Sequence, residues 1–491
     1  MRTVALIRGL QARGWAVTVG SPAARNAASA SLADGGATVV DAPLNRSPPL
    51  AALLAVARPA LVIFDKFTAE EAFSHAVREH APGAARVVDL QDVASLRRAR
   101  GRAVGEADER AKGAAAPPPP PCLAATAAET STPPPLSPLH AALAAVPAAG
   151  GDPDGGREVA AILRCDAALV CSPLEGALLA GGWGLPPAKL VPAPFFARPL
   201  GHRRAVTPVG RSWGDRTHFV MVGHHGHAPN ADGLTWLTAP GGAWDAIADA
   251  CPGAELHVWG AYESAAARGV ACARRRILLR GRAPNLSVLG RARVLLAPLR
   301  FGAGLKGKVV EAWARGTPVV TTPIGAEGFF PAAASGAAPP GFPTAPDAPG
   351  GWWWGGPYGG GVTALPPGAP VPVGCPDAAD GRWGGLWTAL DAAAFAADAV
   401  RLYNDDMLWA ACSSRGAALH DALAGRDATL APVLDALEAL AADPASLGAA
   451  RAADHTGAAF WAAGVRATEY FSRWIELKEA VKAGGGGERG V

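Results

Sequence analysis

The chain has 491 residues, of which 50% are hydrophobic and 18% charged, a composition typical of globular domains that excludes wholesale disorder. Its 45 basic and 42 acidic residues leave a formal charge of +3, too even to favour a nucleic-acid or anionic-membrane partner. The seven cysteines contain no C-x-x-C pair, so neither a zinc cage nor a disulfide framework is indicated.

The N-terminus shows neither a secretory cleavage pattern nor an apolar run of about 18 residues, so we expect a soluble, cytoplasmic protein without an integral membrane segment. A helix is predicted over residues 3–13 and a strand over 15–19. A doubly wound domain normally begins with a strand, which is missing here. A truncated gene model, which could also lack a targeting segment, is one interpretation of this start.

The first half of the chain then alternates strands and helices, which predicts a parallel sheet. The expected strands are 38–40, 61–64, 86–90 and 167–171, and the expected helices are 70–80, 157–164 and one that follows Ser172. Ser172 and Glu175 have the spacing of a capping box. Residues 101–156 are rich in alanine, proline and glycine, with five prolines at 117–121, and predict an extended, disordered insertion.

The alternation repeats from His218 onward. Strands are expected at 218–222, 254–259, 277–280, 293–297 and 317–322, and helices at 232–250, 285–291, 305–315 and 391–402. The simplest account is two Rossmann-like domains, the first from 1–100 with 157–200 and the second from 210–330 with 386–440.

Two further segments flank this second domain. Residues 331–385 are rich in glycine, proline and tryptophan and are interpreted as a disordered insertion. The alternative, in which Trp352, Trp353 and Trp354 stack on a sugar, is less favoured. The tail, 441–491, carries an expected helix near 466–482 with an apolar stripe.

The most informative run is RVLLAPLRFGAGLKGKVVEAWARGTPVVTTPIGAEGFF, residues 293–330, which predicts strand, glycine loop, helix and strand. Gly302, Gly304 and Gly307 let the backbone approach a ligand closely, and the helix beginning near Leu305 presents free N–H groups to it. This arrangement favours a bound diphosphate.

Two common motifs inside this run are rejected. The three glycines spell G-x-G-x-x-G, but the next strand ends in Thr321 and Thr322 where a dinucleotide fold needs an acid for ribose. Residues 302–308 also spell G-x-x-x-x-G-K, but Val309 stands where a hydroxyl must bind magnesium. A dehydrogenase and a P-loop NTPase are therefore disfavoured.

Together with VGHHGHAPNADGLTWL, LHVWG and ILLRGRAPNLSVLGRARVLLAPL, this run resembles group 1 glycosyltransferases, the retaining GT-B enzymes that use nucleotide sugars. The resemblance covers residues 218–330. It implies an α/β fold of two Rossmann-like domains facing a central cleft. It also implies transfer of a sugar, expected to be a hexose, from a nucleotide-diphosphate donor to an unidentified acceptor with retention, without a metal cofactor.

The resemblance also implies site residues. Glu311 would accept hydrogen bonds from the donor ribose, although a pair with Lys308 or Arg315 is the alternative. Lys306 and Lys308 would neutralise the diphosphate, and Arg300 could assist them. Lys306, Lys308 and Glu311 are thus the candidate catalytic residues.

The remaining donor contacts are expected around the same loop. The candidates are His227, Gly281, Arg282, Gly302, Gly304, Leu305, Gly325 and Glu327, with Gly281 and Arg282 near the nucleobase. Ala303 stands where the family usually has a second glutamate, which leaves sugar selectivity open, and Gly325, Ala326 and Glu327 are expected to replace its contacts. A metal on His224, His225 and His227 is disfavoured because no further ligand is nearby.

Acceptor binding is assigned to the first domain, since FDKFTAEEAFS (64–74) and VVDLQDVASLRRAR (87–100) resemble acceptor-side segments of the family. Asp65, Lys66, Asp89 and Asp92 are the candidates there, with helix caps and ion pairs as the alternative. Two other functions stay open: a non-catalytic homologue that binds nucleotide sugars, and a GT-B nucleotide-sugar epimerase.

Overall fold

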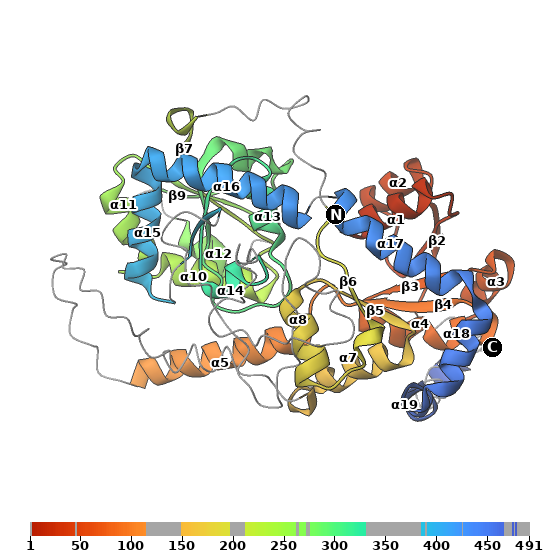
Figure 1. Cartoon of the computed structure of the whole chain (residues 1–491). Helices are drawn as coiled ribbons and strands as arrows, with labels where there is room; N and C mark the ends of the chain where they lie inside the picture. Colours follow the sequence, from red (N-terminus) through yellow and green to blue (C-terminus); the bar gives the residue numbers. More distant parts are fainter. Residues whose placement is uncertain are drawn as a thin grey trace, which may run out of the picture. The chain divides into compact units, whose positions relative to one another are not determined.

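The computed structural model describes residues 2–44, 47–113, 149–196, 212–261, 265–271, 275–329, 384–387, 390–424 and 426–465, and also 474–475 and 477–478. The tryptophan triplet and most of the predicted tail helix lie outside the described residues. The chain divides into two compact units. Unit 1 comprises Met1–Val93, Pro153–Arg203 and Asp421–Val491, and unit 2 comprises Ala94–Asp152 and Arg204–His420 (Figure 1).

Unit 1 contains two parallel sheets. The larger has the order β3-β4-β5-β6, and the smaller pairs β1 with β2. The strands are β1 (Thr18–Ser21), β2 (Thr38–Asp41), β3 (Leu61–Asp65), β4 (Ala85–Asp89), β5 (Ala167–Val170) and β6 (Leu190–Pro192). The helices are α1 (Arg2–Ala12), α2 (Ala27–Asp34), α3 (Ser47–Ala57), α4 (Phe67–His80), α7 (Pro153–Arg164), α8 (Pro173–Ala177), α17 (Arg426–Ala442), α18 (Pro444–Ala453) and α19 (His455–Phe460).

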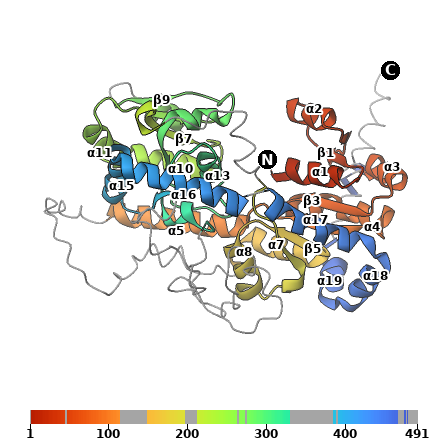
Figure 2. The ribbon, with the colours of Figure 1, turned by 45° about the horizontal axis from the view of Figure 1, so that its top comes forward.

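The core of unit 1 joins the two ends of the sequence. Leu6 and Leu10 of α1 and Leu434 of α17 are buried against Val87 and Leu169, which alternate with residues on the opposite face of the sheet. Figure 2 shows α1 and α17 together beside β3. A helix from beyond residue 420 therefore completes a domain that the first 93 residues begin, whereas the sequence assigned 421–440 to the second domain.

Unit 2 is built on a six-stranded parallel sheet with the order β12-β11-β10-β7-β8-β9. The strands are β7 (Thr217–Val222), β8 (Leu256–Trp259), β9 (Ile277–Leu279), β10 (Ala292–Ala297), β11 (Val319–Thr321) and β12 (Gly385–Trp387). Counted within the unit, the order is 6-5-4-1-2-3, which is that of the Rossmann fold. The chain reverses its direction of travel between β7 and β10, so the loops after these two strands diverge at the carboxyl edge.

Helices cover both faces of this sheet. They are α5 (Ala94–Gly113), α10 (Ala228–Thr238), α11 (Ala243–Ala250), α12 (Ala265–Val270), α13 (Gly307–Trp313), α14 (Pro323–Ala326), α15 (Ala392–Asn404) and α16 (Asp406–Ala424), with a 3₁₀ helix at Leu286–Arg291. None of the described helices is long and apolar enough to span a bilayer.

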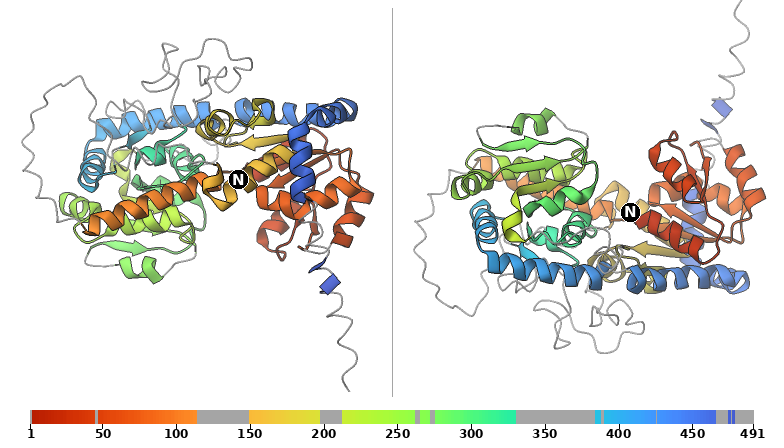
Figure 3. Two further views of the ribbon diagram at one scale, coloured as in Figure 1. Left: turned by 90° about the horizontal axis from the view of Figure 1, so that it is seen from below. Right: turned by 90° about the horizontal axis from the view of Figure 1, so that it is seen from above.

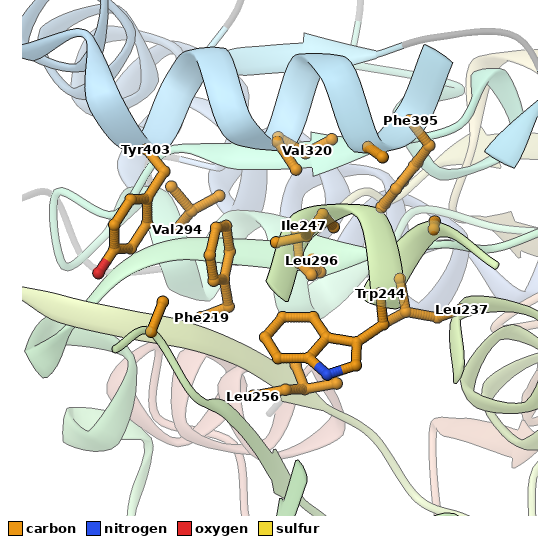
Figure 4. Close-up of a cluster of buried hydrophobic side chains, with 14 of the residues drawn as sticks. Phe219, Leu237, Trp244, Ile247, Leu256, Val294, Leu296, Val320, Phe395 and Tyr403 are labelled. Carbon is orange, nitrogen blue, oxygen red and sulfur yellow. The ribbon is translucent and has the colours of Figure 1, made fainter. Parts of the chain in front are cut away.

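One face of the sheet carries the main core of unit 2. Phe219 of β7 stacks on Tyr403 of α15 with ring centroids 4.5 Å apart and meets Trp244 of α11 edge-on at 5.8 Å. Leu296 and Ile247 fill the space between them, and Figure 4 shows these side chains converging from both helices and the strands. Alternate residues of each strand point into this core, because successive side chains of a strand point to opposite faces of the sheet.

The expectation of an α/β fold with two Rossmann-like units is confirmed, and several local expectations need correction. Residues 101–113 are not part of an extended insertion but continue α5, the long orange helix along unit 2 in Figure 3. Prolines begin only at 117, so nothing in 94–113 prevents a helix. The predicted helix 232–250 is two helices, because Gly241 has a φ of +70° and breaks it.

The predicted capping box at Ser172 is also wrong. Ser172 occupies the N-cap position of α8, but its side chain makes no capping hydrogen bond. The Glu175 carboxylate instead accepts a hydrogen bond of 2.7 Å from the backbone N–H of Val93. A tertiary contact has replaced the local one that the spacing suggested.

Replacing Trp244 with alanine should remove the largest fully buried side chain of the core and destabilise unit 2 by about 3–5 kcal/mol. Urea unfolding followed by circular dichroism would measure it. The control is Met407→Ala, since Met407 is 77% exposed and should change stability by less than about 0.5 kcal/mol. Equal effects of the two substitutions would show that this core is assigned wrongly.

Candidate functional site

The loops after β7 and β10 lie at the point where the strand order of unit 2 reverses. The first loop, 223–227, leads into α10, and the second, 298–306, leads into α13. Open α/β sheets bind ligands at this point because the diverging loops leave helix N-termini and backbone groups uncovered. The candidate donor residues of the sequence fall mainly on the second loop.

Close backbone packing holds these loops in place. A Cβ on Gly233 of α10 would lie 2.5 Å from the carbonyl oxygen of Pro298, so a glycine is needed where α10 meets the β10 loop. A Cβ on Gly325 would lie 1.8 Å from the hydroxyl of Thr321. Gly304 has a φ of +64°, which favours glycine. The sequence predicted a backbone role for Gly304 and a sugar contact for Gly325, and it did not indicate the packing role of Gly233 or Gly325.

Lys306 is bound by its own loop. It is buried, its ammonium donates to the carbonyl oxygens of Gly304 and Ala303, and it lies 3.7 Å from the Glu327 carboxylate. Its charge is therefore partly balanced inside the protein.

Arg100 is a site residue that sequence reasoning missed. Its guanidinium donates to both carboxylate oxygens of Glu327 at 2.7 and 2.9 Å, and to the carbonyl oxygen of Gly302 at 2.8 Å. The two charged side chains are 1% and 3% exposed. Such a pair is costly to break, because either partner alone would be a buried, uncompensated charge. Arg100 and Glu327 thus fix the glycine loop on α5.

This pairing bears on the predicted role of Glu327. Both of its carboxylate oxygens are engaged by Arg100, so Glu327 holds the glycine loop, and its contact with the donor sugar stays a prediction. Because Arg100 lies more than 200 residues before its partners, no sequence pattern could have indicated the contact.

Arg300 is matched by two carboxylates. Its guanidinium bonds Asp108 of α5 at 2.7 and 2.9 Å and Asp232 of α10 at 2.9 Å. The predicted phosphate contact of Arg300 is therefore disfavoured by the geometry. The residue instead joins three segments of unit 2.

Lys308 differs from both of these cations. Its ammonium donates a hydrogen bond of 2.7 Å to the amide oxygen of Asn230, and no described carboxylate forms an ion pair with it. Burial and the charge of Lys306 lower the pKa of Lys308 to about 8. Of the three predicted cations, Lys308 is the one that forms no ion pair with a carboxylate among the described residues.

Glu311 lies one turn further along α13 and is buried. Its carboxylate pairs with Arg315 at i, i+4, and Arg315 also donates to its backbone carbonyl oxygen at 2.7 Å. The sequence offered this pair as the alternative to ribose binding. The carboxylate has four acceptor positions, so one guanidinium leaves capacity for further donors. Ribose binding by Glu311 stays a prediction.

The remaining donor candidates lie at the same carboxyl edge. His227 is exposed at the N-cap of α10, and Arg282 is exposed after β9. Gly281, with a φ of +66°, accepts a hydrogen bond of 2.8 Å from the N–H of Gly260. Gly302 is buried and Leu305 is half-buried. Their contacts with a ligand stay predictions.

The acceptor candidates lie in unit 1, at the ends of two neighbouring strands. Asp65 and Asp89 are register partners in β3 and β4. Asp89 is buried and pairs with Arg2, whereas Asp65 is exposed and accepts a hydrogen bond of 2.6 Å from Gln91. Lys66 is also exposed, and its φ of +73° is strained for a non-glycine residue.

Asp89 and Asp92 are the less accessible of the four acceptor candidates. Asp89 follows the ion-pair alternative that the sequence left open. The half-buried Asp92 donates its backbone N–H to the carbonyl oxygen of Leu90 at 2.6 Å. Asp65 and Lys66 are therefore the more accessible candidates for an acceptor.

A second polar cluster lies at the opposite, amino edge of the unit 2 sheet. His218, Glu255 and His257 bring ligand atoms within 4.8 Å of one another. His257 lies 2.7 Å from the Glu255 carboxylate, the N–H of Glu255 donates to Nδ1 of His218, and Arg280 lies 4.0 Å from the same carboxylate. Hydrogen bonds and ion pairs account for this clustering, so we assign it no metal.

Comparison with known proteins identifies the domain that holds the site. The family model of the group 1 glycosyl transferases matches residues 216–339, which include the β7 loop, the β10 loop and α13. Residues 216–339 are a group 1 glycosyltransferase domain. The chain therefore contains a glycosyltransferase domain, which supports the transferase activity that the sequence predicted. A comparison with curated proteins finds no match.

Two solved structures have a fold similar to that of this chain. A glycosyltransferase from Rickettsia africae ESF-5 superposes with a TM-score of 0.53 at 9% identity, covering 89% of this chain and 93% of that one. Anabaena Alr3699/HepE, solved in complex with UDP and glucose, superposes with a TM-score of 0.51 at 12% identity over 89% and 95%. At such identities the likeness shows the GT-B fold alone.

The environment of Lys308 predicts an ammonium group that titrates near pH 8, because burial and Lys306 oppose its charge. Lysines labelled by reductive methylation with ¹³C can be followed by NMR between pH 6 and 11. One resonance should titrate about two units below the ordinary lysine value and be missing from Lys308→Arg. Titration of that resonance at the ordinary value would contradict the described environment.

Proposed function

We propose that the enzyme takes its sugar from a nucleoside-diphosphate sugar, with the diphosphate bound by the β10 loop and Lys308 and the ribose bound by Glu311. The observation that carries the proposal is the ammonium of Lys308 at the Rossmann switch point, held by the neutral amide of Asn230 and unpaired with any described carboxylate. A partly buried cation of this kind is stabilised by a bound anion.

The chemistry follows from the same groups. As the glycosidic bond to the donor phosphate breaks, negative charge builds up on the leaving diphosphate. Lys308 stabilises that charge directly. The first N–H groups of α13 and the ammonium of Lys306 add to this positive potential. The protein can thus supply cationic stabilisation from its own side chains, and the transferred sugar is proposed to keep its anomeric configuration, as the family resemblance implies.

Sugar selectivity is proposed to differ from the usual family pattern. Ala303 carries no carboxylate, and Glu327 is occupied by Arg100. The backbone of Gly325 and Ala326, buried in the short helix α14 after β11, is proposed to replace these sugar contacts. On the acceptor side, the exposed Asp65 and Lys66 at the end of β3 are proposed to bind acceptor hydroxyls.

Titration calorimetry with UDP, GDP, ADP and CDP tests the donor site, with UDP first because HepE was solved with UDP. One diphosphate should bind, and Lys308→Met and Glu311→Gln should each weaken it about tenfold or more. Asp249→Asn, which removes an exposed charge on α11, is the control and should leave affinity unchanged.

The ribose contact has its own readout. The wild-type protein should prefer the diphosphate over its 2′,3′-dideoxy analogue, and Glu311→Gln should lose most of that preference. A folded wild-type protein that binds none of the four diphosphates would overturn the proposed donor. Binding that is insensitive to both substitutions would place the donor elsewhere.

A further inference from the structure

Asn230 makes two hydrogen bonds that orient its amide uniquely. Its Nδ2 donates to the backbone carbonyl oxygen of His224 at 3.0 Å, and its Oδ1 accepts from the Lys308 ammonium at 2.7 Å. A carbonyl can only accept and an ammonium can only donate, so the reversed amide would lose both bonds. Asn230 is 8% exposed. The N-cap of α10 is His227, so Asn230 lies within the first turn of the helix and does not cap it.

The loop around Asn230 is packed to fit this amide. A Cβ on Gly223 would lie 2.7 Å from the Asn230 Cγ, and a Cβ on Gly260 would lie 2.1 Å from the carbonyl oxygen of Gly223. The N–H of His225 donates to Ala261 at 3.0 Å. Gly223 therefore lets the β7 loop pack against Asn230, and Gly260 and the His225 hydrogen bond let the β8 loop pack against the β7 loop. Asn230, and through it Lys308, is held by these two loops.

The chemical identity of residue 230 matters as much as its position. An aspartate has nearly the same shape and could also accept from Lys308, but it would neutralise the ammonium. The described site does use carboxylates for its other cations, two with Arg300 and one with Arg100. The neutral amide fixes Lys308 in space and leaves its full charge for an anion.

We propose that Asn230 is the positioning residue of the donor site, which holds the Lys308 ammonium in place for the diphosphate without cancelling its charge. This inference rests on the proposed function. It adds a residue that touches no reacting atom and acts only through Lys308. An amide serves this role better than a carboxylate because the amide leaves the charge of Lys308 uncancelled.

The decisive variant is Asn230→Asp, which keeps the side-chain volume, changes the charge and also gives up the hydrogen bond to the carbonyl oxygen of His224, an effect on the loop that the uridine affinity reports. It should weaken UDP binding about tenfold or more while leaving the affinity for the nucleoside uridine within about twofold, because uridine carries no phosphate. The matched control is Thr235→Asp, which adds the same charge at an exposed position of α10 and should leave both affinities unchanged within error.

The pH profile separates positioning from a purely structural role. A lysine must be protonated to bind the diphosphate, so wild-type affinity for UDP should fall as the pH rises through about 8. A carboxylate beside Lys308 favours its charged form, so Asn230→Asp should move that fall upward by about one pH unit or more. Asn230→Ala removes the tether and should weaken UDP about three- to tenfold without the upward shift.

The outcomes distinguish the two proposals. If the wild-type protein binds no diphosphate, the proposed function fails. If it binds UDP, Lys308→Met weakens binding, and Asn230→Asp matches the wild-type affinity and pH profile, then only the role of Asn230 is overturned. A loss of uridine and UDP affinity by equal factors in Asn230→Asp would also overturn it, since that pattern indicates damage to the loop.

Discussion

A lysine ammonium that is partly removed from water must be stabilised by something, and the choice of partner determines what the group can do. A carboxylate partner makes it structural, whereas a neutral partner keeps it available to an external anion. In unit 2, Arg100 and Arg300 are paired with carboxylates, whereas Lys308 is hydrogen-bonded to the neutral amide of Asn230.

Arg100 and Arg300 hold the donor loop in place, and Lys308 is the cation left to bind an anion. Arg100 holds the glycine loop through Gly302 and Glu327, and Arg300 joins α5 to α10 through Asp108 and Asp232. Both connections use α5, a helix that precedes the Rossmann strands of its unit by more than 100 residues of sequence. Unit 2 therefore depends on a segment from outside the matched family domain to fix its donor loop.

Much of this was predictable from the sequence, and the failures have physical causes. Hydrophobic periodicity gave most of the strands and α13 because each buried strand and helix face needs a local apolar pattern. The three-residue strands β6 and β12 were missed because they are too short to show a period, and β1 lies three residues later than predicted at its start. The helical part of α5 was missed because composition was averaged over 101–156, which mixes a charged helical stretch with a proline tract. The division at 420 was missed because α17 packs on α1, more than 400 residues away.

The site was predicted less completely than the fold for a related reason. Motif spacing located Lys306, Lys308 and Glu311 on one loop and helix, since they are neighbours in sequence. It could not show that Arg300 and Glu327 are already paired, or that Asn230 bonds Lys308, because each of these depends on a contact between distant residues.

The measurement that tests the account most directly is amide hydrogen exchange with and without saturating UDP, read out as peptides along the whole chain. The account predicts slower exchange in 302–311 and in 223–230, where the β10 loop, α13 and the Asn230 loop would bind the diphosphate and ribose. It predicts no change at the amino edge around His218 and His257. Protection confined to any region other than the β7 and β10 loops would contradict the central claim.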